Sequence, residues 1–202
     1  MKGDWAMKKV IIIAVIGSVF LITSPVQADL VELDLLALGC PTVHDFDTPQ
    51  WSYDFDLGVQ FSNIQHVYMD WSGEITGGMA ERIGNPDPFP APVYIEAAIG
   101  SPFNWRHTDI DGGLATYPDP ELFDAKTEFI YGTMPWSELF DGKHDIKLSY
   151  HEYILLDGRY VEHGSVSLTK AKLVVEGTII PEPSSFLIIC LGGLILKTKR
   201  RK

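Results

Sequence analysis

The stretch from Trp51 to Phe61 reads Trp-Ser-Tyr-Asp-Phe-Asp-Leu-Gly-Val-Gln-Phe, and it decides the fold class. Every second residue is aromatic or aliphatic, and the residues between them are small or polar. Successive side chains of a β-strand point to opposite faces, so this period of two predicts a strand with one buried face. The side chains expected on that face are Trp51, Tyr53, Phe55, Leu57, Val59 and Phe61.

Other segments bounded by Gly, Pro, Asn or Asp are predicted as further strands. They are residues 30–38, 64–71, 93–99, 127–131, 145–155 and 165–176. No segment shows the period of an amphipathic helix. Two sheets, each with one apolar face, bury those faces against each other. We therefore expect residues 29–180 to form an all-β, antiparallel β-sandwich of the jelly-roll-like kind, flanked by an N-terminal signal-peptide helix and a short C-terminal apolar helix.

The connections are predicted from turn residues. Asp157-Gly158 tolerates the positive φ angles of a type I′ turn, so a hairpin is expected there, with the two long C-terminal strands paired. Longer loops are expected at Gly84–Pro92 and Arg106–Asp124, and a functional surface is most expected on such loops.

The second predicted loop contains a candidate calcium site. Asp109 and Asp111, followed by a glycine, resemble the opening of many calcium-binding loops, and Asp119 offers a further carboxylate. The remaining ligand spacing of such a loop is missing, so a solvated polar turn is the alternative. Ca²⁺ is the single candidate cofactor, and no other cofactor is expected.

The charge of the middle of the chain limits its partners. Between Asp29 and Ile180 there are 8 Lys and Arg residues against 25 Asp and Glu residues, a formal charge of −17. Such a surface repels nucleic acid and anionic lipid and attracts cations or basic partners, although acidity also simply keeps a protein soluble. The two cysteines, Cys40 and Cys190, are not expected to pair, so the apolar core must hold the domain together.

The N-terminal 28 residues have the order of a secretory signal peptide. Lys8 and Lys9 precede a nearly all apolar run, residues 10–22, which is followed by a polar stretch ending in Ala28. A thirteen-residue helix is too short to cross the hydrocarbon core comfortably. We expect signal peptidase to cleave after Ala28, and translation to start at Met1 or Met7.

The last 22 residues have three parts in a fixed order. Pro181-Glu182-Pro183 comes first and is expected to be extended, because proline disfavours helix at the residue before it. A short apolar segment follows, containing Phe186, Leu187, Ile188, Ile189, Leu191, Leu194, Ile195 and Leu196. The chain then ends in the basic residues Lys197, Lys199, Arg200, Arg201 and Lys202, which the positive-inside rule keeps cytoplasmic.

This order resembles the PEP-CTERM sorting signal. The resemblance implies recognition by an exosortase, cleavage near Pro181–Pro183, and release to or beyond the outer surface of a Gram-negative cell that makes exopolysaccharide. The alternative is a plain C-terminal anchor, but eleven apolar residues fall short of the about 20 that a stable span needs.

Catalytic chemistry is not indicated in the middle of the chain. His144, His151 and His163 lack the spacing of a zinc site, and no serine stands in a nucleophile motif. Carboxylate pairs are too frequent here to single out a glycosidase, so the domain is not expected to be an enzyme. Trp105 and Trp136 lie near the predicted loops and are candidates for stacking against sugar rings.

The sequence therefore predicts an exported protein of the cell envelope, outer surface or extracellular matrix. Its partners would be signal peptidase, an exosortase and the membrane around residues 186–196. Its ectodomain would have a structural or binding role, with exopolysaccharide or other surface components as candidate ligands. The alternatives are a secreted hydrolase of matrix polysaccharide and a calcium-stabilised adhesive domain.

Overall fold

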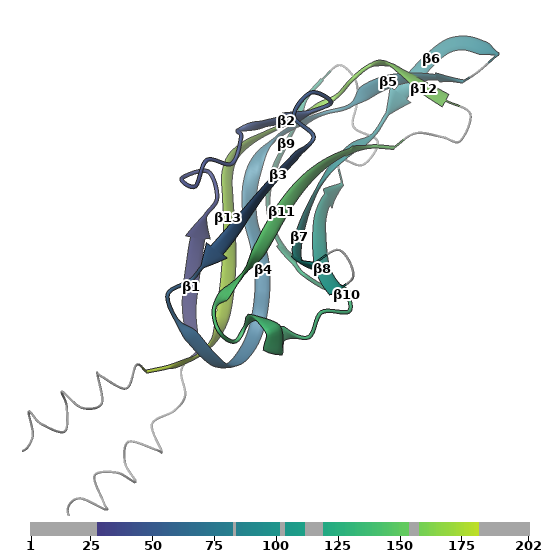
Figure 1. The fold of residues 1–202 in the computed structure, drawn as a ribbon. Coiled ribbons are helices and arrows are strands. Elements are labelled where there is room, and N and C mark those ends of the chain that lie inside the picture. The colour runs from purple at the N-terminus through teal and green to yellow at the C-terminus, as the bar shows by residue number, and fades with distance from the viewer. Residues whose placement is uncertain (1–27, 83, 102–103, 112–118, 154–157, 182–202) are drawn as a thin grey trace, which may run out of the picture.

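A computed structural model describes residues 28–82, 84–101, 104–111, 119–153 and 158–181 (Figure 1). Most of these residues are in strands and none is in an α-helix, which confirms the all-β class. The strands are β1 (Asp29–Asp34), β2 (Val43–Asp45), β3 (Gln50–Asp56), β4 (Gln60–Thr76), β5 (Gly78–Arg82), β6 (Asn85–Ala91), β7 (Val93–Ser101), β8 (Asn104–Asp111), β9 (Glu121–Glu128), β10 (Tyr131–Gly132), β11 (Lys143–Glu152), β12 (Gly158–Glu162) and β13 (Ser165–Ile180), with one 3₁₀ turn, η1 (Trp136–Leu139).

The helices expected at the two ends lie outside the described residues, as do the apolar segment 186–196 and Glu182 and Pro183 of the sorting signal. Within the part of the chain that is described, no helix is long and apolar enough to span a membrane.

Three antiparallel sheets make up the structure. Sheet A has the order β1-β13-β4-β9, with β2 also paired to β13, and sheet B has the order β10-β8-β7-β11-β3. These two sheets face each other as the layers of a sandwich (Figure 1). The small sheet C, β12-β5-β6, extends from one end of the sandwich.

The core lies between sheets A and B. Trp71 and Leu173 from sheet A and Ile95 and Leu148 from sheet B are all 0% exposed. The buried apolar cluster of the described residues extends along the chain from Leu35 to Val175 and includes the expected core residue Trp71. Because this core is formed within residues 29–181, we expect that segment to fold independently.

Residues 51–61, which were expected to form one strand, contribute to two strands. β3 ends at Asp56 in sheet B and β4 begins at Gln60 in sheet A, so the chain crosses between the layers. Gly58, with φ of 69°, makes the turn that allows the crossing. The expected inward face survives in part, because Phe55 and Phe61 are 3% and 1% exposed whereas Tyr53 is 36% exposed.

The expected pairing of the two long C-terminal strands is wrong. β11 pairs with β7 and β3 in sheet B, while β13 pairs with β1, β2 and β4 in sheet A. β12 pairs with β5. Asp157, in the expected turn, lies outside the described residues. A turn dipeptide predicts a reversal of the chain but does not identify the partner of the strand that follows it.

The proline-rich segment expected to be a loop is strand β6. It forms the edge of sheet C, where Met79 pairs with Pro90 and Ala80 with Phe89. Proline lacks an N–H and is tolerated in a sheet at an edge, where that N–H is not needed by a neighbouring strand. An edge without those donors is a poor template for an added strand, so the prolines protect it.

The other expected loop, residues 106–124, is also shorter than predicted. β8 continues to Asp111 and β9 starts at Glu121, and residues 112–118 lie outside the described ranges. The predicted strand at 127–131 is interrupted, because β9 ends at Glu128 and β10 begins at Tyr131. The strand predicted at 93–99 is confirmed as part of β7, and those at 64–71 and 165–176 lie within β4 and β13.

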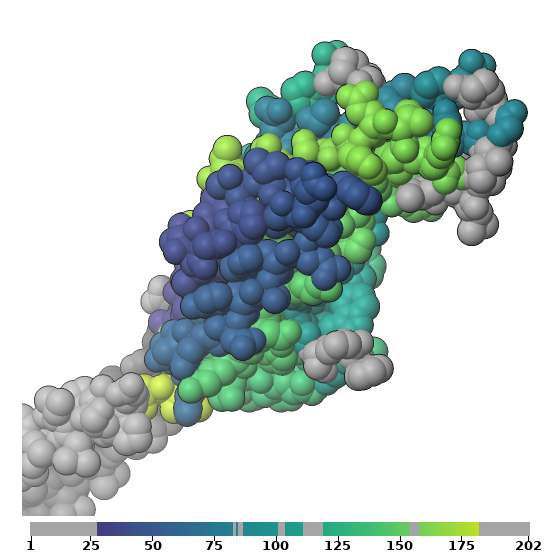
Figure 2. All heavy atoms as spheres, turned by 45° about the horizontal axis from the view of Figure 1, so that its top comes forward, coloured from purple at the N-terminus to yellow at the C-terminus, as the bar shows by residue number. Residues whose placement is uncertain are grey.

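Sheet C forms an arm beyond the sandwich (Figure 2). The paired strands β4 and β13 continue past Thr76 and Ser165 as the paired strands β5 and β12. Glycines stand where β4 leads into β5 and where β12 leads into β13. A Cβ on Gly164 would lie 2.4 Å from the Thr76 carbonyl oxygen. The close backbone approach at this junction therefore requires glycine there.

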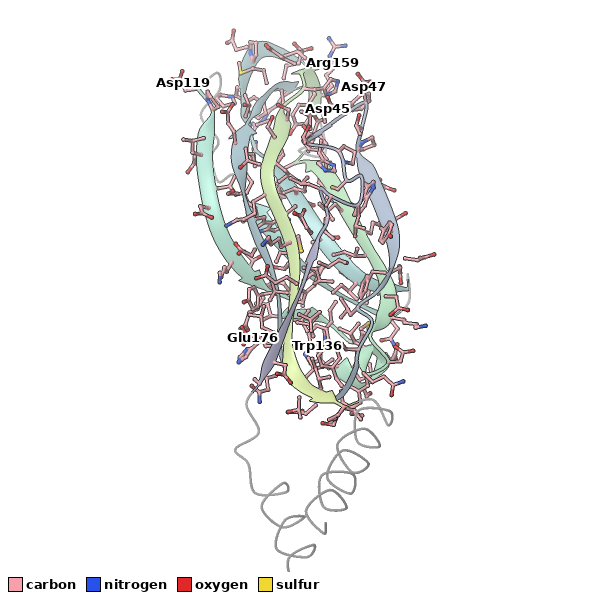
Figure 3. All side chains as sticks on the ribbon, turned by 90° about the vertical axis from the view of Figure 1, so that its left-hand side faces the viewer. Asp45, Asp47, Asp119, Trp136, Arg159 and Glu176 are labelled. Carbon is pink, nitrogen blue, oxygen red and sulfur yellow. The ribbon has the colours of Figure 1, made fainter. Side chains whose placement is uncertain are left out.

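Both ends of the described chain lie at the pole opposite the arm, as Figure 3 shows. Asp29 at the start of β1 pairs with Gly177 near the end of β13. The last residue of β13, Ile180, is still paired with Gln60 of β4, so the sandwich ends immediately before Pro181.

Candidate functional site

The outward side of sheet B carries a set of aromatic and histidine side chains. Val93, Ile95, Ala97 and Ile99 of β7 point into the core, so the residues between them point outward. The register of β8, β10 and β11 places further aromatic residues on the same side. We call this surface the aromatic face and define it by Trp105, His107, Tyr131, Tyr94 and His151.

Two groups of rings are in contact on the aromatic face. The ring centroids of Trp105 and His107 are 4.4 Å apart, and those of His107 and Tyr131 are 5.2 Å apart, both with tilted rings. Tyr94 and His151 are stacked at 4.7 Å with an interplanar angle of 14°. Tyr131 is 55% exposed and Trp105 is half-buried. The rings therefore hold one another in place while leaving part of their surface to solvent.

Carboxylates lie between and beside these rings. Glu96 of β7 is directly opposite Asp109 of β8, and its carboxylate is 3.5 Å from Nδ1 of His107. In the same sheet, Asp145 of β11 is directly opposite Asp54 of β3. Like charges at opposed positions repel each other. One acid of each pair contacts a histidine, Glu96 contacting His107 and Asp145 contacting His144, and each pair keeps a second carboxylate, Asp109 or Asp54.

The outward side of sheet A has a different character. Its lysines meet carboxylates: Lys170 lies 2.7 Å from Asp70 and 2.9 Å from Asp124, and Lys172 lies 2.7 Å from Glu32. Lys126 covers the ring of Tyr68 at 5.3 Å. Exposed ion pairs of this kind stabilise little, but they occupy the groups that a ligand would need.

The two tryptophans proposed as sugar platforms are in different situations. Trp105 belongs to the aromatic face. Trp136, in η1, packs against the core, and the Arg106 guanidinium lies over its ring at 4.5 Å. The Arg106 Nε donates to the Met134 carbonyl oxygen at 2.6 Å, and this hydrogen bond holds the guanidinium over the Trp136 ring. Trp136 is therefore a poor platform, and the prediction for it is not supported by its surroundings.

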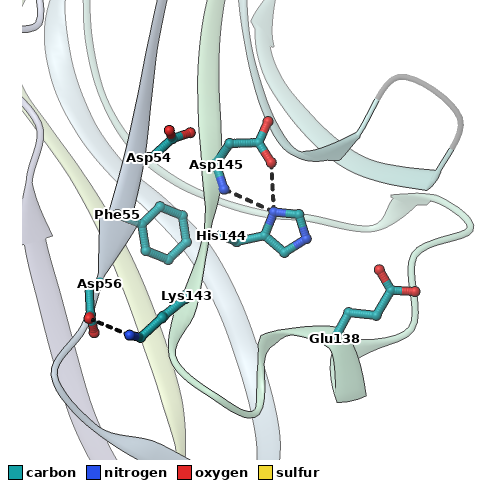
Figure 4. A pocket seen from close by; sticks show the side chains of 7 residues that line it. All are labelled: Asp54, Phe55, Asp56, Glu138, Lys143, His144 and Asp145. Atoms are coloured by element: carbon teal, nitrogen blue, oxygen red, sulfur yellow. Dashed lines mark hydrogen bonds and ion pairs between the residues drawn. The ribbon is translucent and has the colours of Figure 1, made fainter.

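A shallow depression of about 740 Å³ lies at the β3 side of sheet B (Figure 4). It is lined by Asp54, Phe55, Asp56, Glu138, Lys143, His144 and Asp145. The Asp56 carboxylate accepts from the Gly58 N–H at 2.8 Å and is 3.1 Å from the Lys143 ammonium. These two contacts hold the pKa of Asp56 below its ordinary value, with the Gly58 hydrogen bond the larger cause.

This depression is where a glycosidase-like carboxylate pair would be sought. A general acid needs a raised pKa, and that of Asp56 is shifted in the opposite direction, so Asp56 is suited only to an ionised role. His144 and Asp145 are joined through Nδ1 and Oδ1 at 2.7 Å, which engages a second of the four carboxylates that line the depression. The hydrolase alternative remains a prediction, to be tested by release of reducing ends from matrix polysaccharide.

Cys40, between β1 and β2, and His44, in β2, form a buried pair. The Cys40 Sγ lies 3.6 Å from Nε2 of His44, and both residues are in the interior at 5% and 0% exposure. Burial raises the pKa of the Cys40 thiol to about 12 and lowers the pKa of His44. A thiol with this pKa is not a nucleophile at neutral pH, so the pair is structural.

We expect Cys40 to resist alkylation in the folded protein. In a Cys190→Ser variant, iodoacetamide at pH 8 should leave the native chain almost unlabelled, because the thiol is both buried and protonated. The same chain in denaturant should be labelled completely, and mass spectrometry measures both. Rapid labelling of the native chain would show that the Leu35–Cys40 region opens readily.

Two of the three candidate calcium ligands, Asp109 and Asp111, are on a strand, where a loop was expected. Asp109 is exposed within β8, and Asp111 is the last residue of that strand. Asp119 lies just before β9 and is exposed. The described residues contain no group of three His, Cys, Asp or Glu side chains placed to hold a metal. Calcium binding therefore stays a prediction, which a melting temperature that rises with Ca²⁺ and falls with chelator would support.

Sequence reasoning identified Trp105 but missed His107, Tyr131, Tyr94 and His151 as its partners. Trp105 and His107 are two residues apart, a spacing that shares a face once the segment is known to be a strand. The segment was expected to be a loop, so this signal was not used.

Comparison with known proteins adds little to this description. No protein-family model and no curated protein matches the chain. A chain in the solved structure of the infectious bursal disease virus Gx strain is similar at 12% identity and a TM-score of 0.22. The match covers 76% of this chain and 38% of the viral chain, and a TM-score this low does not indicate a shared fold.

Proposed function

We propose that this protein is exported, cut after Ala28, and sorted to the cell envelope or extracellular matrix by an exosortase-type enzyme acting near Pro181, Glu182 and Pro183. The sandwich is then a non-catalytic structural or binding domain, with exopolysaccharide as its partner. The resemblance of the C-terminal 22 residues to the PEP-CTERM signal supports the sorting step. The aromatic face supports the binding step.

The position of the chain ends is the observation that carries the export proposal. Ala28 precedes β1 and Pro181 follows β13, and these strands are neighbours with Asp29 opposite Gly177. Neighbouring strands are about 4.8 Å apart, so both ends leave from one small area of the surface. A signal peptide before Ala28 and an apolar segment from Phe186 can therefore enter the same membrane without distorting the domain.

The crossings between layers favour a jelly-roll-like arrangement of the sandwich. The chain passes from sheet B to sheet A between β3 and β4, returns through sheet C to β7, and crosses again between β8 and β9. Repeated exchange between two antiparallel layers is the property of jelly rolls and other Greek-key sandwiches.

Intact mass measured after cell fractionation tests the sorting proposal. The protein is expressed in its own host and in the same host lacking its exosortase. We expect a chain that begins at Asp29 and ends near Pro181–Pro183 only where the exosortase is present. A tail still attached through Lys202 in both strains would mean a simple anchor, and the sorting proposal would fail.

A pair of variants makes this experiment specific to the motif. Glu182→Ala should accumulate as the uncut chain in the exosortase-containing host. Glu121→Ala removes the same charge from an exposed position at the start of β9 and should be processed normally. Equal processing of the two variants would show that the Pro-Glu-Pro motif is not read.

A further inference from the structure

We propose that the aromatic face binds a polysaccharide of amino sugars that carries free ammonium groups. This deepens the proposed function, on which it rests, by naming the class of glycan. The occupant is inferred from two properties of the same side of sheet B, its partly exposed rings and its opposed carboxylates.

The rings supply the apolar part of such a site. Trp105, His107 and Tyr131 lie side by side on the neighbouring strands β8 and β10, at one edge of sheet B. The C–H-bearing faces of sugar rings pack against aromatic rings, whose electron-rich faces attract the partly positive hydrogens. Trp105 pairs with Gly100, so the adjacent strand presents no side chain beside the indole.

The centre of the face is low except at Lys147, because most of its other side chains are short, and an extended chain can lie across it. Next to His107 the register places Ala98 and then Lys147, and next to Glu96 it places Ser149. Ala98, Gly100 and Ser149 have short side chains or none. Tyr94 and His151 border this low region toward the arm. A ligand in contact with both groups of rings crosses these small residues and the pair of Glu96 and Asp109, while Asp145 and Asp54 lie beyond Gly100 in the row of Trp105.

The carboxylates determine the charge of the ligand. Glu96 is opposite Asp109, and Asp145 is opposite Asp54, so each pair holds two acids at a distance where they repel. His107 contacts Glu96 and His144 contacts Asp145, whereas Asp109 is exposed and is the carboxylate best placed to receive an ammonium group. An ammonium group placed between two such carboxylates relieves the repulsion and gains charge-assisted hydrogen bonds.

The same charges exclude anionic polysaccharides. A chain of uronic acids crossing the face would bring its carboxylates against Glu96 and Asp109, and the formal charge of −17 over residues 29–180 outweighs Lys147 on that path. Attraction of a cationic glycan should weaken as salt rises, because the Debye length falls from about 10 Å at 0.1 M to about 3 Å at 1 M.

Binding of defined glycans to the full chain, purified in detergent, tests the proposal. The probes are partly de-N-acetylated poly-N-acetylglucosamine, the fully acetylated polymer and a polyuronate. We expect the first to bind with a salt-dependent Kd, the second to bind more weakly, and the third not to bind. Absence of binding by the first probe, or equal binding of the polyuronate, would overturn the proposal.

Variants locate the site. Trp105→Ala and Tyr131→Ala should each weaken binding of the de-N-acetylated polymer about five- to tenfold, since one aromatic contact contributes up to about 1.5 kcal/mol. Tyr131 is 55% exposed, so its variant is expected to fold even if the Trp105 variant does not. Unchanged affinity in a folded Tyr131→Ala chain would show that the aromatic face is not the binding site.

A matched pair tests the charge. Asp109→Asn should weaken binding and flatten its salt dependence, whereas Asp124→Asn, which neutralises an exposed carboxylate on sheet A, should change neither. Equal effects would mean that only net charge matters and would overturn the site. If the chain is exported and cut as proposed but binds no de-N-acetylated glycan, this inference fails and the sorting proposal stands. If the chain binds that glycan but is never cut, only the sorting proposal fails.

Discussion

Leu173→Ala should lower the free energy of unfolding of residues 29–181 by about 2–5 kcal/mol. Leu173 is 0% exposed and lies in β13, opposite Leu33 of β1 and Met69 of β4. The variant loses buried apolar surface and leaves a cavity that two fixed neighbouring strands cannot close. A domain is stabilised by only about 5–15 kcal/mol in total, so this loss brings the sandwich near its limit.

Urea denaturation followed by tryptophan fluorescence measures this change, and Leu122→Ala is its control. Leu122 lies in β9, another strand of sheet A, and is 79% exposed, so the same substitution there should cost less than about 0.5 kcal/mol. Equal losses in the two variants would mean that the core is not where the structure places it.

Gly142→Ala should have the second large effect. Gly142 has a φ of 75°, and a Cβ built on it would lie 2.1 Å from the Val59 carbonyl oxygen. Its own carbonyl oxygen accepts from the Leu57 N–H at 2.8 Å, at the point where the chain crosses from sheet B to sheet A. The left-handed conformation alone costs about 1–2 kcal/mol with a side chain, and the contact with the backbone adds to that cost.

Gly58→Ala separates the two causes. Gly58 lies in the crossing itself with a φ of 69°, but a Cβ added there would meet nothing within 4 Å. It should therefore show the conformational cost only, and Gly142→Ala should be the more destabilised in the same urea experiment. A larger loss for Gly58→Ala would indicate that the crossing is not held by the contact between Gly142 and Val59.

The fold class was predictable because alternation is a local property of the chain. Phe55 and Phe61 are buried as the period of two requires, although they lie in different sheets. The crossing was not predictable, because alternation continues through Gly58 and does not record which sheet a strand joins. The partners of β11 and β13 were missed for the same reason, since pairing depends on contacts between distant segments.

The candidate site was only partly predictable. Trp105 was identified by residue type, but its neighbours depend on the register of β8 with β7 and β10. Trp136 has the same residue type and is covered by Arg106, which lies 30 positions earlier in the sequence. Whether a tryptophan is open or covered is thus set by tertiary contacts that composition does not contain.

The position of β13 has a mechanical consequence. A domain held by its C-terminus and pulled by a ligand on sheet B carries the load through β13, which is paired on both sides with β1 and β4. The pull runs along the strand, so many of its hydrogen bonds are loaded together in shear. A pull between the two ends at the same pole would instead unzip β1 from β13 one bond at a time. The proposed cleavage after Ala28 would leave only the stronger, sheared direction of loading.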